Sequence, residues 1–239
     1  MILSNVVSAT TRPLCLPHPR LVLQREQGQY PPLSAAERSP AMLAFLDARL
    51  VLLSVPKTGT TALETALRPH AQAVLTGHPG LKHIELRAFQ RFVAPVLDRA
   101  GAPRFETVAV LREPVDRLRS WYRYNARDEV IGRADSTARV TFGQFIEGYL
   151  SPDQPPYARI GRQAWFVDPL PGREPVDHLF RYEGMDACLA FLSGRLGRRI
   201  APPRMNVSPE ADTSLDPALE RRLREALADE TALWEGARH

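Results

Sequence analysis

One short polar loop, Lys57-Thr58-Gly59-Thr60-Thr61, combines residue types that bind phosphate. Gly59 allows the backbone to approach a ligand closely. The amides after Gly59 would open a helix without intrahelical partners, so they can hold an anion. The threonine hydroxyls add donors, and the Lys57 ammonium can follow negative charge that develops on a leaving oxygen. The loop therefore predicts a phosphate or sulfate site.

The loop differs from nucleoside-triphosphate-binding loops, which read G-x-x-x-x-G-K-[ST]. Lys57 comes two residues before Gly59, and no glycine lies five residues before Gly59. No aspartate at the end of a predicted strand indicates a magnesium site. These departures disfavour a kinase. The alternative for the tetrapeptide at 56–59, taken alone, is a polar turn without a ligand.

A second basic segment follows at residues 112–122. Arg112 comes at the end of an apolar run, and Ser120 lies eight residues later, about two helical turns. A guanidinium can bind a terminal phosphate through two hydrogen bonds, so Arg112 and Ser120 could clamp one. Arg117, three residues before Ser120, would share its helix face. The alternative is that the arginines of this segment only solvate a surface helix.

Alternating apolar runs and helical stripes position the two motifs. The pattern predicts strands at 49–55, 107–111 and 178–182, and helices at 60–67, 86–97, 114–122, 142–149, 185–196 and from 216 onward. This alternation predicts an α/β fold with a central, mainly parallel sheet covered by helices on both faces. Ligands bind such sheets beyond the carboxyl ends of the strands. We expect residues 1–40 to form an irregular arm and residues 41–239 to form a single domain.

The composition is that of a globular protein, with 44% hydrophobic and 24% charged residues. A net charge of +4 does not by itself indicate a nucleic-acid-binding protein. Lys57 and Lys82 are the only lysines, and the many arginines suit phosphate and sulfate recognition.

Cys15 and Cys188 have no metal-ligand spacing. No apolar run has the length of a membrane span, and no basic secretory region opens the chain. We therefore expect a soluble, cytoplasmic protein without a metal.

Taken together, the motifs resemble those of a known enzyme family. Residues 56–61 (PKTGTT) are similar to the 5′-phosphosulfate-binding loop of sulfotransferases that use 3′-phosphoadenosine 5′-phosphosulfate (PAPS). Residues 112–122 (REPVDRLRSWY) are similar to their 3′-phosphate-binding segment, and the 55 residues from Lys57 to Arg112 also match. The similarity covers roughly residues 45–236 and is closest to the carbohydrate and heparan-type branch and its small bacterial members. Weaker agreement is found at 181–183, 206–208 and 216–234.

The resemblance implies a P-loop-like three-layer sandwich that transfers a sulfuryl group from PAPS to a hydroxyl or amine of a small-molecule or glycan acceptor. Lys57 would contact the bridging oxygen and the sulfuryl group. The 5′-phosphate would bind to Thr58, Gly59, Thr60 and Thr61, and the 3′-phosphate to Arg112 and Ser120. No metal is implied, because Lys57 and the amides neutralise the leaving group. Some relatives are anchored in the Golgi, so a chain without an anchor suggests a bacterial protein.

A base must accept the acceptor's proton, and three residues between the motifs are candidates. His83 comes first, because its intrinsic pKa suits this role and relatives often place a Lys-His pair, a catalytic acid or a histidine in this region. Glu85 is second, because some family members use a glutamate about this far from the loop lysine. His78 is third. A local hydrogen bond at the start of a helix is the alternative role of His83.

Other interpretations stay open. A P-loop-type kinase is disfavoured by the displaced lysine, and a non-catalytic nucleotide-binding protein by the intact motifs. A nucleic-acid-binding protein is disfavoured because no aromatic residues alternate with a basic stripe. The acceptor is also open: Trp121, Tyr122 and Tyr124 either line its site or pack a helix, and packing is favoured for the first two. The arginines of 125–165 either contact an anionic acceptor or are solvated.

Overall fold

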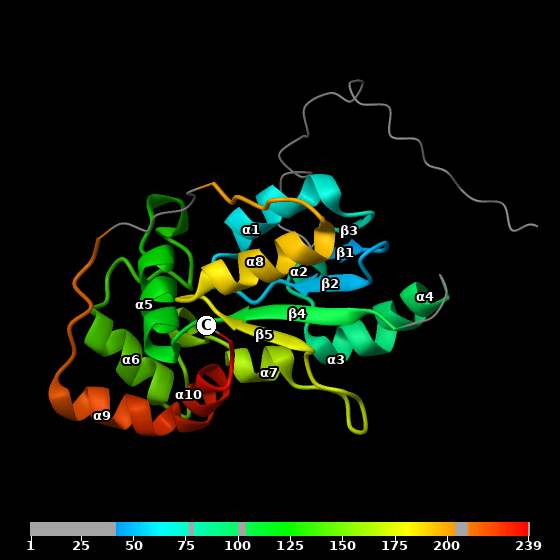
Figure 1. The fold of residues 1–239 in the computed structure, drawn as a ribbon. Coiled ribbons are helices and arrows are strands. Elements are labelled where there is room, and N and C mark those ends of the chain that lie inside the picture. The colour runs from blue at the N-terminus through cyan, green and yellow to red at the C-terminus, as the bar shows by residue number, and fades with distance from the viewer. Residues whose placement is uncertain (1–41, 77–78, 100–103, 204–209, 239) are drawn as a thin grey trace, which may run out of the picture. The chain divides into compact units, whose positions relative to one another are not determined.

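The computed structural model describes residues 42–76, 79–99, 104–203 and 210–238, which belong to one compact unit (Figure 1). The strands are β1 Met42–Phe45, β2 Leu50–Leu53, β3 Ala73–Leu75, β4 Glu106–Leu111 and β5 His178–Arg181. The helices are α1 Thr60–Leu67, α2 Pro79–Lys82, α3 Leu86–Ala88, α4 Ala94–Asp98, α5 Pro114–Asn125, α6 Phe142–Leu150, α7 Gln163–Val167, α8 Met185–Leu196, α9 Pro217–Ala226 and α10 Ala228–Glu235. A π-helical segment spans Phe89–Val93, and 3₁₀ turns span Arg68–His70, Asp128–Val130 and Pro156–Ala158. The predicted arm, 1–40, lies outside the described residues.

The strands form one five-stranded mixed sheet in the order β3-β1-β2-β4-β5. β2 pairs with β4 and β4 with β5 in parallel, whereas β1 runs antiparallel to both β2 and β3. The three strands that were predicted are confirmed. The mainly parallel sheet is confirmed only in part, because the β1–β2 hairpin and β3 were not predicted. The hairpin turns at Arg49, which has a positive φ of 51°.

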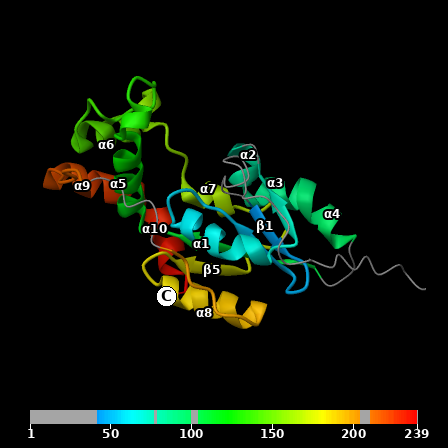
Figure 2. The ribbon, with the colours of Figure 1, turned by 90° about the horizontal axis from the view of Figure 1, so that it is seen from above.

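Helices cover both faces of this sheet (Figures 1 and 2). One face packs against α3, the π-helical segment, α4, α7 and α10. The opposite face packs against α1 and α8. A third apolar cluster joins α5, α6 and α9, next to the carboxyl end of β4, where α5 begins. Because adjacent side chains of a strand point to opposite faces, continuous apolar runs such as Leu50–Leu53 supply both layers.

Most predicted helices are confirmed, with two corrections. The helix predicted at 86–97 contains the π-helical segment just before Pro95, whose missing N–H breaks the regular hydrogen-bond ladder. The last helix is not continuous, because Leu227 departs from helical geometry with φ −103° and ψ 10° between α9 and α10. Within the described ranges, no helix combines the length and apolar character that a bilayer crossing requires.

Candidate functional site

The loop between β2 and α1 contains two residues in left-handed backbone conformations. Lys57 has φ 70° and Gly59 has φ 74°. Glycine adopts this conformation readily, whereas a lysine there is strained by roughly 1–3 kcal/mol. Gly59 is the N-cap of α1 and offers no side chain to the first amides of the helix. Such amides, at the carboxyl edge of a parallel strand pair, are free to bind an anion.

Gly59 also occupies a position where no side chain would fit. A Cβ atom there would come within 2.7 Å of Cε2 of Tyr182, the residue that follows β5. Tyr182 is fixed because its backbone N–H donates to the Leu111 carbonyl at 2.7 Å. The loop between β2 and α1, called the anion loop below, therefore packs directly on the carboxyl end of β5.

We expect Gly59→Ala to lower the free energy of unfolding by more than Gly197→Ala. Both glycines have positive φ, 74° and 64°, but a Cβ at Gly197 would meet no atom within 4 Å. Gly197→Ala therefore carries only the backbone penalty, about 1–2 kcal/mol, whereas Gly59→Ala adds the overlap with Tyr182. Urea denaturation of both variants measures the difference, and equal losses would contradict the close packing at Gly59.

The loop threonines direct their hydroxyls inward. Thr58 is fully buried and donates to the Val55 carbonyl at 2.9 Å, and Oγ1 of Thr60 lies 3.5 Å from the same carbonyl. Thr61 is half-buried at the start of α1. The hydroxyls of Thr58 and Thr60 therefore hold the loop in shape, which differs from the prediction that they donate to a ligand.

Arg112 connects the two motifs. Its Nη1 donates to the Lys57 carbonyl at 3.2 Å, and its Nε donates to Asp116 at 2.7 Å. The centre of its guanidinium lies 4.5 Å from the centre of the Tyr182 ring. A carbonyl, a carboxylate and an aromatic face thus hold the side chain beside the loop. The structure therefore brings together the two predicted basic residues, 55 positions apart in the chain.

The Lys57 ammonium lies against aromatic rings of α5. Its Nζ is 3.6 Å from the centre of the Tyr124 ring and 5.5 Å from the centre of the Trp121 ring. The guanidinium of Arg127 lies 4.6 Å from the centre of the same Tyr124 ring. Tyr122, by contrast, is buried and packs edge-to-face against Phe142, so packing is confirmed for Tyr122. Trp121 packs as well but also faces Lys57.

Positive charge accumulates around Lys57. Burial chiefly, and then the charges of Arg127, Arg112 and Lys82, lower the pKa of Lys57 to about 7. Arg112 is paired with Asp116. Lys57 and Arg127 instead contact aromatic rings and have no carboxylate partner among the described residues. An anionic ligand would favour the charged form of Lys57 and relieve this repulsion.

Lys57, Arg112, Arg127 and Lys82 are called the cation cluster below. His83 follows α2 directly, and the charges of Lys82 and Lys57 act on it. Its Nδ1 is 2.6 Å from the Ser54 carbonyl. Because a carbonyl only accepts, Nδ1 carries the proton in this hydrogen bond. Burial lowers the pKa of His83 to about 4 against the opposing effect of that bond, and the charges of Lys82 and Lys57 add to the lowering. The ring is therefore neutral near pH 7 with Nε2 as a proton acceptor, but the lowered pKa makes it a weaker base than the intrinsic pKa of histidine predicts.

The remaining predicted residues differ in burial and in hydrogen bonding. Ser120 is buried on α5. Arg117 is 4% exposed and donates to the Gly161 carbonyl at 2.7 Å, so it is a buried structural residue and not a solvated one. Glu85 is exposed at the N-cap of α3, without a side-chain capping bond. His78 lies outside the described residues, as do 206–208.

Three further residues of the site were missed by the sequence analysis. Tyr182 was seen as the end of a strand and as part of the weak family agreement at 181–183, but no role in the site was predicted for it, although strand ends are where such sheets bind ligands. Arg127 was one of several arginines in 125–165, and others of that group, Arg133 and Arg162, are paired with carboxylates. Gln163, whose side chain hydrogen-bonds the backbone of Arg112, gave no signal in the sequence.

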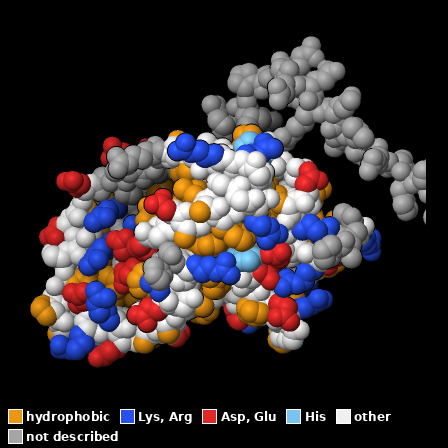
Figure 3. Space-filling model, in the orientation of Figure 1, with side chains coloured by type: hydrophobic (Ala, Val, Ile, Leu, Met, Phe, Trp, Pro, Cys, Tyr) orange, Lys and Arg blue, Asp and Glu red, His pale blue; other side chains and the backbone are white. Residues whose placement is uncertain are grey.

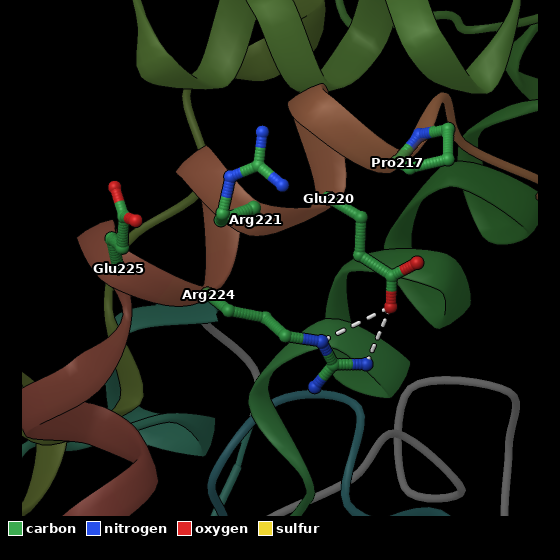
Figure 4. A pocket seen from close by; sticks show the side chains of 5 residues that line it. All are labelled: Pro217, Glu220, Arg221, Arg224 and Glu225. Carbon is green, nitrogen blue, oxygen red and sulfur yellow. Dashed lines mark hydrogen bonds and ion pairs between the residues drawn. The ribbon is translucent and has the colours of Figure 1, made fainter.

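Two surface pockets include neither Lys57 nor His83. One lies along α9 (Figure 4), where Arg224 pairs with Glu220 at 2.6 Å and the charges compensate each other. The other is lined by residues of α6, α7, α9 and the segment between α6 and α7. Basic and acidic side chains are likewise intermixed over the face seen in Figure 3. We place the candidate site at the cation cluster, because Lys57 and Arg127 have no carboxylate partner among the described residues.

No family model, curated protein or solved structure matches this chain. The assignment of a function therefore depends on the geometry and electrostatics of the site itself.

Proposed function

We propose that this chain is a PAPS-dependent sulfotransferase with a P-loop-like arrangement of β2, α1, β4 and α5. The observation that carries the proposal is the Lys57 ammonium, buried beside Arg127, Arg112 and Lys82 without a carboxylate of its own. Such a site favours a ligand with several negative charges. PAPS has this character, because it bears a phosphate on the 3′ side and a phosphosulfate on the 5′ side.

The polar atoms of the site fit an anionic ligand. The indole Nε1 of Trp121 is buried and has no hydrogen-bond partner among the described residues. A buried donor without an acceptor is unfavourable. A phosphate or sulfate oxygen would satisfy it. The backbone at Lys57 and Gly59 and the first turn of α1 would hold the 5′-phosphate, and Arg112 with Ser120 would hold the 3′-phosphate.

Bound PAPS would supply the sulfuryl group, which forms a bond to the acceptor oxygen or nitrogen as its bond to the 5′-phosphate oxygen breaks. Lys57 would stabilise the charge that develops on this leaving oxygen. Nε2 of His83 would take the proton of the attacking group. Tyr124, which is 38% exposed, offers an aromatic face next to the Lys57 ammonium on which a sugar ring or another acceptor can lie.

Label transfer tests the proposal against its rivals. The protein is incubated with a panel of glycans and small hydroxyl compounds, together with either sulfur-labelled PAPS or ATP labelled in its γ-phosphate plus magnesium. We expect label to enter an acceptor from PAPS alone, and to do so in the presence of a chelator. Transfer from ATP alone would establish a kinase. Tight nucleotide binding without transfer from either donor would favour a non-catalytic nucleotide-binding protein.

A further inference from the structure

We infer that Gln163 is a positioning residue for the nucleotide site. Its side-chain amide fixes the backbone of Arg112 and thereby sets where the guanidinium meets a 3′-phosphate. The inference rests on the proposed function, since the ligand group concerned is the 3′-phosphate of PAPS.

Arg112 lies just beyond the end of β4, where neighbouring strands no longer supply hydrogen-bond partners. The Leu111 carbonyl still accepts from the backbone of Tyr182. At Arg112 the side chain of Gln163 supplies both partners. Its Oε1 accepts a hydrogen bond from the Arg112 N–H at 3.1 Å, and its Nε2 donates to the Arg112 carbonyl at 2.7 Å. A carboxamide offers one acceptor and a donor side by side, as a peptide group does. Gln163 therefore replaces a strand partner at this residue.

Gln163 is itself held by buried groups. Its side chain is fully buried at the start of α7, and its backbone N–H donates to Oε2 of Glu230 on α10 at 3.3 Å. Glu230 is 1% exposed, and its Oε1 accepts from Nε of Arg162 at 2.9 Å. Because these groups are buried, water does not readily replace a bond that is lost. The chain of contacts thus connects α10 through α7 to Arg112.

The position of the Arg112 backbone decides what its guanidinium can reach. The guanidinium contacts Asp116, the Lys57 carbonyl and the face of Tyr182 at once, and these groups come from three different segments. If the backbone were released, Asp116 would retain the guanidinium through the ion pair, while the contacts that orient it toward the loop would loosen. Binding of a 3′-phosphate would then have to order Arg112, which lowers affinity.

Two nucleotides that differ only in the 3′-phosphate test this role. Wild type, Gln163→Met and Gln163→Glu are titrated calorimetrically with 3′,5′-ADP and with 5′-AMP. We expect the wild-type preference for 3′,5′-ADP to fall about tenfold or more in both variants, with the affinity for 5′-AMP unchanged. Gln163→Glu keeps an acceptor for the Arg112 N–H but places an oxygen against the Arg112 carbonyl. Like Gln163→Met, it therefore removes the hydrogen bond to that carbonyl, but the two substitutions differ in how they affect the stability of the protein. When combined with Arg112→Ala, either variant should cause no further loss.

Gln90→Met is the matched control. The Gln90 side chain also bridges two backbone groups, accepting from the Leu170 N–H at 2.9 Å and donating to the Glu174 carbonyl at 2.7 Å, but it has no contact with Arg112. It should lower the melting temperature without changing the nucleotide preference. An unchanged preference in both Gln163 variants, or an equal weakening of both nucleotides, would overturn the positioning role. Absence of the preference in wild type would instead overturn the proposed function.

Discussion

Lys57→Met is expected to lower the rate of sulfuryl transfer by about 10²–10³-fold and to weaken 3′,5′-ADP binding far less. The ammonium acts on an oxygen that becomes negative only as the bond to the 5′-phosphate breaks, so most of its effect belongs to the transition state. Methionine retains the length of the side chain and its contact with Tyr124. Steady-state kinetics with PAPS, together with calorimetry of 3′,5′-ADP, separate the two effects.

Lys82→Met is the control, because it removes the same charge at the other lysine of the chain. Lys82 acts on Lys57 through its charge and lies outside the anion loop, so we expect a much smaller loss of rate. Equal losses in the two variants would contradict a specific role of Lys57 and favour a general electrostatic effect.

The lowered pKa of Lys57 also sets the expected pH dependence. With a pKa of about 7 in the ligand-free protein, Lys57 loses its proton as the pH rises through 7. An anionic ligand favours the protonated form, so above pH 7 binding should take up a proton and weaken, in total by no more than the loss of affinity in Lys57→Met. Calorimetry in buffers of different ionisation enthalpy measures the uptake. Lys57→Arg should abolish it, because arginine stays protonated.

His83→Asn is expected to lower the rate of transfer by about 10²–10⁴-fold while leaving 3′,5′-ADP affinity unchanged. The asparagine amide can still donate to the Ser54 carbonyl, in place of Nδ1, so the variant removes the base and retains the structural bond. Because the pKa of His83 is about 4, the wild-type profile of kcat/KM should show no loss between pH 8 and pH 5 that depends on this residue.

Glu85→Gln and His78→Asn complete this comparison of candidate bases. Glu85 is exposed and lacks a side-chain capping bond, so its substitution should leave the rate close to that of wild type. A larger loss in Glu85→Gln than in His83→Asn would contradict the assignment of His83.

The sequence predicts those elements whose signals are local. The buried run before Lys57 and the Pro114 start of α5 placed both motifs at strand ends, and Gly197 marked the end of α8 with a φ of 64°. The β1–β2 hairpin was missed because its turn, 46–49, contains no glycine or asparagine. Arg49 takes the positive φ instead, a conformation that an arginine does not signal.

The candidate site was predictable where it depends on spacing along one segment, and not where segments from distant parts of the chain meet. Lys57, Gly59 and Arg112 belong to motifs, so their types and order indicated an anion site. The packing of Tyr182 on Gly59 and the amide of Gln163 on Arg112 depend on tertiary contacts between residues 123 and 51 positions apart. The pKa of Lys57 also reflects burial and charges from several segments, which no single window of sequence contains.

The most direct test of the central claim is a magnesium-free calorimetric titration of wild type and Arg112→Ala with 3′,5′-ADP, 5′-AMP and ATP. We predict that wild type binds 3′,5′-ADP more tightly than the other two nucleotides, and that Arg112→Ala removes this preference, because the guanidinium provides a charged contact to the 3′-phosphate. Equal or tighter binding of ATP, or a 3′,5′-ADP preference that survives in Arg112→Ala, would contradict the assignment of this site to PAPS.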